Sequence, residues 1–171
     1  MKDSDNTRPS KGWILAFHPD LICGTALGAN IRDYTFFSYR PEEALHVSLR
    51  EKQVILELLD KINEELQRCI DCYSQKIISK YIELLLDYCE RFYERQFITR
   101  NEANKKIIER FDRLLDDHFN TIQSQSSDLP TIEECVRVLR LSPAYFNDLL
   151  EYETGKSYKE YLQFKRFEIA K

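Results

Sequence analysis

Apolar residues recur at a helical spacing through the middle of the chain, from Ser48 onward. Segment 49–70 carries one apolar stripe, and Ser48 with Glu51 matches the capping box that opens a helix. Segments 74–97 and 100–123 follow with the same period, which predicts an antiparallel helix pair plus a third helix. The second helix is apolar on two faces, so either its own chain or a second copy must cover both. These faces hold Ile78, Tyr81, Ile82, Leu85, Cys89 and Phe92, and Ile77, Leu84 and Tyr88.

The N-terminal part of the chain lacks this helical period. Short apolar or aromatic runs at 13–17 and 34–39, with a third at 44–47, predict strands. Two or three strands cannot form a stable sheet alone, so we expect them to be the end of a larger β-structure. The predicted fold is therefore mainly α, with a short β remnant at the N-terminus.

Three shorter helical patterns follow a polar linker at 124–128. They cover 131–139, 143–152 and 157–170, and a short turn at 140–142 separates the first two. Two short helices joined in this way indicate a helix-turn-helix, here followed by a longer trailing helix.

Composition and charge narrow the functional classes. The net charge is −4, and the last 46 residues carry seven basic and eight acidic side chains, which argues against a strong free-standing DNA binder. Neither a membrane-spanning stretch nor a secretory signal is visible, so we expect a cytoplasmic protein without membrane contact. The five cysteines and three histidines lack metal-ligand spacing, and catalytic motifs are missing. We therefore expect neither an enzyme nor a metal or cofactor.

The C-terminal segment resembles a known family. The order and spacing of its residues are similar to the first helix-turn-helix of AraC-type (AraC/XylS) transcriptional regulators of bacteria. The matching residues are Pro130-Thr131-Ile132, Leu139-x-Leu141-Ser142-Pro143-x-Tyr145-Phe146, Glu153-Thr154-Gly155-Lys156-Ser157 and Glu160-Tyr161-Leu162. Less specifically, the family's last sensor strands resemble Gly12-Trp13, Phe17-His18-Pro19-Asp20, Phe36-Phe37-Ser38-Tyr39 and Glu43-Ala44-Leu45-His46.

The resemblance implies a truncated regulator in three parts. Residues 1–47 would be the partial end of a cupin-like sensor domain, and 48–125 a helical dimerisation and linker region. Residues 126–171 would be the first helix-turn-helix of the DNA-binding domain. We expect a homodimer formed through helices 49–70 and 74–97.

The resemblance also implies DNA as the partner, with the helix at 143–152 inserted into a major groove. The positions aimed at base edges would be Ala144, Asn147 and Asp148. The candidates for phosphate contact would be Thr131, Ser142, Lys156 and Ser157. Other roles stay open from the residues alone: Thr131 and Ser142 are also helix caps, Lys156 can complement a helix end, and Asp148 can be a solvated surface carboxylate.

The predicted recognition helix departs from the family in its charge. Family members often carry arginine at the position of Asp148, whereas this chain has no lysine or arginine from 143 to 155. Because carboxylates repel phosphate, we expect the isolated chain to bind DNA weakly. The alternative is a dimerising protein–protein interaction module that no longer reads DNA. Residue patterns identify neither an operator nor an effector small molecule.

Overall fold

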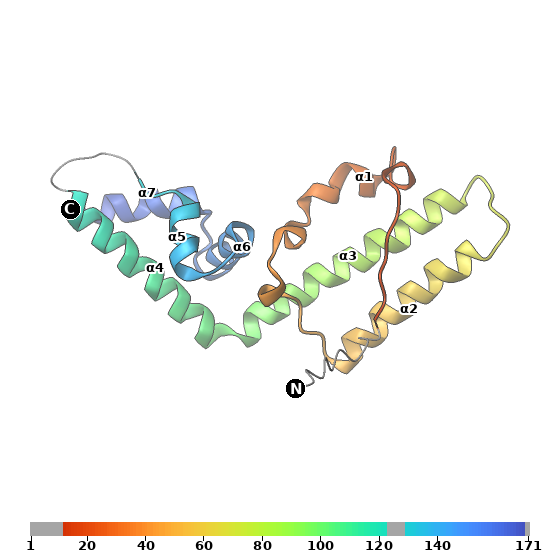
Figure 1. The fold of residues 1–171 in the computed structure, drawn as a ribbon, viewed down its shortest axis with the longest axis horizontal. Helices are drawn as coiled ribbons and strands as arrows, with labels where there is room; N and C mark the ends of the chain where they lie inside the picture. The colour runs from red at the N-terminus through yellow and green to blue at the C-terminus, as the bar shows by residue number, and fades with distance from the viewer. Residues whose placement is uncertain (1–11, 123–128, 170–171) are drawn as a thin grey trace, which may run out of the picture.

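The computed structural model describes residues 12–122 and 129–169. Figure 1 shows α2 and α3 as an antiparallel pair, with α1 and its neighbouring turns along α3. Helix α4 leads away from the end of α3, and α5, α6 and α7 gather beside it. The linker predicted at 124–128, residues 1–11 and residues 170–171 lie outside the described part.

The mainly α fold class is confirmed, and the long helices begin and end within a few residues of the predicted positions. The α-helices of the described part are α1 (Ala26–Asn30), α2 (Leu49–Leu66), α3 (Ser74–Thr99), α4 (Asn101–Ile122), α5 (Ile132–Leu139), α6 (Pro143–Thr154) and α7 (Tyr158–Ile169). Short 3-10 helices lie before α1 and between α1 and α2: η1 (Pro19–Leu21) comes first, and η2 (Ile31–Asp33), η3 (Thr35–Ser38) and η4 (Pro41–Glu43) follow α1.

The predicted strands at 13–17, 34–39 and 44–47 are wrong, since the described residues contain no strand. The aromatic run instead forms η3 and lies along α3. Phe36 stacks on Tyr93 with ring centroids 5.4 Å apart, and the hydroxyl of Tyr34 donates to Asp87 at 2.5 Å. A helix face therefore buries these side chains, where the sequence predicted a sheet.

The hydrophobic interior falls into two main clusters, one in each half of the described chain. The N-terminal cluster centres on Ile82 of α3, and the C-terminal cluster on Phe111 of α4 and Phe146 of α6; all three side chains have no exposed surface. A small third cluster joins Phe97 at the end of α3 to Tyr145 and Leu149 of α6. The chain thus brings the end of α3 against the second helix of the predicted helix-turn-helix.

Candidate nucleic-acid interface

A three-residue turn, 140–142, joins α5 to α6. Thr131 caps α5, because its Oγ1 accepts from the backbone N–H of Glu134 at 3.3 Å. Arg140 ends α5 in the left-handed region, at φ 62°, and the N–H of Leu141 closes back on the carbonyl of Val136 at 3.1 Å. Ser142 then caps α6 by accepting from the N–H of Tyr145 at 3.2 Å. The predicted capping roles of Thr131 and Ser142 are confirmed.

The inner face of α6 fixes this unit on α4. Phe146 and Leu150 pack with Cys135, Val136 and Leu139 of α5, and with Tyr158, Tyr161 and Leu162 of α7. The ring of Phe146 meets Phe111 of α4 edge to face, with centroids 4.8 Å apart. The four helices α4, α5, α6 and α7 therefore form one packed body, and α6 has its other face turned away from that core.

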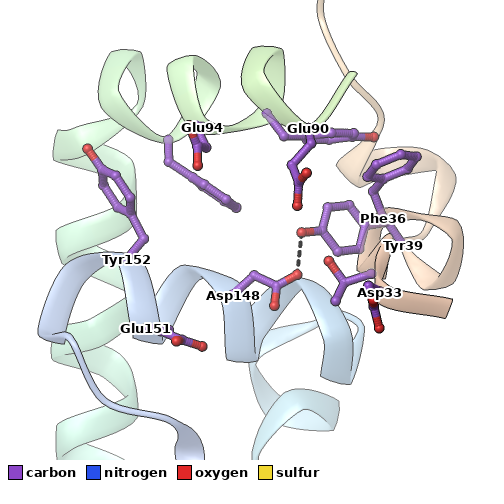
Figure 2. Close-up of a pocket in the computed structure, with 11 residues that line it drawn as sticks. Asp33, Phe36, Tyr39, Glu90, Glu94, Asp148, Glu151 and Tyr152 are labelled. Atoms are coloured by element: carbon purple, nitrogen blue, oxygen red, sulfur yellow. Dashed lines mark hydrogen bonds between the residues drawn. The ribbon is translucent and has the colours of Figure 1, made fainter. Parts of the chain in front are cut away.

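The three positions predicted to face base edges have different surroundings. Asp148 accepts a hydrogen bond from the hydroxyl of Tyr39 at 2.7 Å, from a segment 109 residues earlier (Figure 2). Asn147 accepts from the backbone N–H of Tyr158 at 3.2 Å and so helps to start α7. Ala144 is half-buried. The structure brings the three together on α6 but commits the polar groups of two of them to the protein itself.

The residues predicted to contact phosphate also form hydrogen bonds within the protein. Ser142 is only 3% exposed, and its hydroxyl donates to the carboxyl group of Glu43 at 2.5 Å. Thr131 is exposed and shares a capping box with Glu134, while Ser157 donates its hydroxyl to Glu160 at 2.6 Å.

Lys156, the fourth phosphate candidate, lies beside an aromatic ring. Its ammonium group is 5.0 Å from the centroid of the Phe164 ring and donates to the carbonyl of Thr154 at 3.4 Å. Thr131, Ser157 and Lys156 remain at least partly accessible, whereas Ser142 is enclosed.

The outward side of α6 borders an acidic cavity of about 370 Å³. Figure 2 shows carboxylates reaching it from α6, α3 and the segment before η3, with aromatic rings between them. Burial, followed by neighbouring carboxylates that include Asp87, Glu94 and Asp148, raises the pKa of Glu90. The cavity is lined by Asp33, Glu90, Glu94, Asp148 and Glu151 together with Thr35, Phe36, Tyr39, Tyr93, Phe97 and Tyr152. Negative charge at this mouth repels phosphate and other anions.

Two residues of this region were not predicted from the sequence. Tyr39 and Glu43 reach α6 from the segment that was expected to form strands. A local signal for the second was present: Pro41 stands at a helix start, and Glu43, three residues after Arg40, accepts from the backbone N–H of Arg40 at 2.8 Å. That signal predicts a helical turn in place of a strand, although it does not reveal the contact with Ser142.

The cysteine and histidine side chains of the described residues do not gather at a second site. Cys69 and Cys72 lie exposed between α2 and α3, and His18 accepts from the N–H of Asp20 at 3.3 Å. Within residues 12–122 and 129–169, histidine, cysteine and carboxylate side chains nowhere form a group of three or more able to hold a metal ion. In the same part of the chain, every helix is too short or too polar to cross a membrane.

Comparisons with known proteins identified no relative of this chain. No protein-family model matches the sequence, and neither curated proteins nor solved structures contain a match. What this site can bind must therefore follow from this chain's own residues and their geometry.

Three tyrosine–aspartate hydrogen bonds predict a late alkaline titration. Burial, and then the bond to an aspartate, raises the pKa of Tyr34, Tyr39 and Tyr161 above its ordinary value near 10. A raised pKa of the folded protein means that this stabilisation is complete below pH 10 and is lost as the pH rises further. We expect ultraviolet absorbance to show fewer ionised tyrosines in the folded protein than in denaturant at the same pH. Equal titration curves in both states would contradict the prediction.

Proposed function

We propose that this chain is a DNA-binding transcription regulator of the AraC type, acting in the cytoplasm through α6. The observation that carries the proposal is the α5–α6 unit, with a capped first helix, a left-handed turn residue at Arg140 and a second helix that starts at Pro143. This is the geometry with which helix-turn-helix proteins place their second helix in a major groove. The resemblance of segment 130–162 to the family supports the same function.

The recognition surface of α6 is expected to bind weakly. Ala144 and Asn147 would face the base edges, and Thr131, Lys156 and Ser157 would approach the phosphates. The carboxylates of Asp148 and Glu151 lower the affinity, because little positive charge on α6 offsets them. We expect dissociation constants of about 1–100 μM, the range typical of binding driven mainly by phosphate contacts.

A selection from random duplexes followed by a fluorescence-anisotropy titration tests the proposal. We expect enrichment of a sequence, binding to it at low salt, and loss of binding as salt rises from about 50 to 200 mM. Ala144→Glu adds a charge at the proposed groove-facing position and should weaken binding. Ala103→Glu, the same exchange at an exposed position of α4, is the matched control and should bind as the parent does. Failure to enrich any sequence over repeated rounds would contradict the proposal.

A second candidate function, a dimerising interaction module, is favoured by the second apolar face of α3. Leu84 is 43% exposed there, and Ile77 and Tyr88 are half-buried. A second copy packing its own α2 and α3 on this face would cover them. We expect light scattering at tens of micromolar to give twice the chain mass of 20.4 kDa, and Leu84→Lys to restore the monomer. A monomeric parent protein under these conditions would contradict dimerisation.

A further inference from the structure

We propose that residues 39–43 form a clamp that closes over α6, so that the clamp and DNA compete for the same face of this helix. The inference rests on the proposed function, because it regulates the surface that α6 would present to DNA. Three sets of contacts carry it, and all three join α6 or its cap to segments that precede α4.

The first contact encloses the start of α6. Both carboxyl oxygens of Glu43 accept from Ser142: Oε1 from the backbone N–H at 2.6 Å and Oε2 from the hydroxyl at 2.5 Å. Glu43 is 4% exposed and Ser142 is 3% exposed, so water does not reach the pair freely. Two short hydrogen bonds between the same two residues fix the position of the clamp at the N-terminal end of α6.

The second contact lies six residues further along, nearly two turns into α6. The hydroxyl of Tyr39 donates to Asp148 at 2.7 Å, as the dashed line in Figure 2 marks. The ring of Tyr39 also stands edge to face against Tyr145 and against Tyr93 of α3, each with centroids 5.1 Å apart. Tyr39 thus lies between α3 and α6. Its hydroxyl engages the carboxylate of Asp148, one of the positions proposed to face the bases.

The third contact comes from the end of α3. The ring of Phe97 packs against Tyr145 at 5.4 Å and stacks on Tyr152 at 5.5 Å between centroids. Tyr145, Asp148 and Tyr152 are spaced at i, i+3 and i+7, so they form one stripe along α6. The clamp covers Tyr145 and Asp148, whereas Phe97 covers Tyr145 and Tyr152 and stays in place when the clamp leaves. A duplex groove can therefore reach Asp148 only after Tyr39 has left it.

The clamp can detach from α6 while the helices of the protein stay folded. It lies between two anchors on α3, the Tyr34–Asp87 hydrogen bond and the bond from the N–H of His46 to the side chain of Gln96 at 2.8 Å. Between these anchors the chain forms only 3-10 helices of three or four residues. Release of residues 39–43 therefore breaks few contacts and leaves the helices of both main clusters in place.

The carboxylates around the cavity do not move with the clamp. Asp33, Glu90, Glu94 and Asp148 all line the cavity and lie outside residues 39–43. Release of Tyr39 therefore leaves the Asp148 carboxylate without its hydrogen-bond donor, while the α3 carboxylates stay in place. Closure and DNA binding thus compete for Asp148 and for the space that Tyr39 fills.

Two variants that weaken the clamp test the inference. Tyr39→Phe removes only the hydroxyl that bonds Asp148, and adding Glu43→Gln weakens the bonds to Ser142. Hydrogen–deuterium exchange should then quicken at residues 35–43, and the double variant should bind the selected duplex about tenfold more tightly, since the affinity of a closed protein is reduced by its open fraction. Tyr161→Phe is the matched control, because it removes an equivalent tyrosine–aspartate bond at 2.7 Å away from the clamp. Circular dichroism verifies that each variant folds. If the double variant does not fold, the exchange rate and DNA affinity of Tyr39→Phe alone decide the test.

The outcomes separate the clamp from the proposed function. Faster exchange together with tighter binding supports both. Faster exchange with unchanged affinity for DNA overturns the clamp and leaves the proposed function standing, and unchanged exchange also overturns the clamp. A complete lack of DNA binding by the parent and by every variant overturns the proposed function and, with it, the competition.

Discussion

Replacing Phe146 with alanine is expected to lower the free energy of unfolding by about 3–5 kcal/mol. The side chain has no exposed surface, and its ring packs edge to face on Phe111 of α4. It also meets the ring of Tyr158 in α7, with centroids 6.4 Å apart. Truncation therefore leaves a cavity between three helices that cannot all close on it. Urea unfolding followed by circular dichroism measures the loss.

Val138→Ala provides the control for this measurement. Val138 lies on α5 in the same unit but is 52% exposed, so its truncation should change the free energy of unfolding by about 0.5 kcal/mol or less. A similarly small loss for Phe146→Ala would show that α6 does not pack on α4 as described. The packing that holds α5 and α6 together as one unit on α4 would then be absent.

Replacing Ile82 with alanine is expected to cost about 2–5 kcal/mol of unfolding free energy. Ile82 has no exposed surface and belongs to the cluster that Leu27 of α1 and Ile62 of α2 complete. Its loss opens a cavity in the half of the chain that holds the clamp's anchors. Urea unfolding again measures the effect, with Ile98→Ala as the control on the same helix.

Ile98 is 60% exposed, so its truncation should cost well under half as much. Equal losses for the two α3 variants would contradict the cluster around Ile82. The two core variants lie in separate clusters, and their effects should add in the double variant.

The helices could be predicted from the sequence because their signals are local. The capping box of Ser48 with Glu51 and the cap at Thr131 both form as expected, and Glu134 completes a second capping box with Thr131. The left-handed ending of α6 at Gly155 is likewise a property of one residue and its neighbours. Patterns of this length fix where a helix starts and stops, irrespective of what it packs against.

The N-terminal strands were predicted wrongly because a strand and a segment laid along a helix can share one pattern. Both alternate buried aromatic residues with exposed ones. Phe36 finds its partner in Tyr93 and Tyr34 in Asp87, each more than fifty residues away. Only that distant helix decides whether the segment joins a sheet, so a local window could not distinguish the two.

Only part of the candidate site could be predicted from the sequence, again because a local pattern does not reveal distant contacts. Spacing placed Ala144, Asn147 and Asp148 on one helix, and the structure has them there. The bonds that occupy α6 join residues 99 and 109 positions apart, and neither leaves a periodic trace in the sequence. Only the arrangement of α3 and α6 in space brings these bonded residues together, and no single motif in the chain encodes that arrangement.

Helix α3 is also a mechanical link between the two halves of the molecule. Its 26 residues span about 39 Å at the usual rise per residue, from the side of α1 to the ring of Phe97 beneath α6. A rod of this length converts a tilt of about 5° at one end into a displacement of about 3 Å at the other. A tilt of α3 about its α1 end would therefore be felt as a displacement of the aromatic stack under Tyr152.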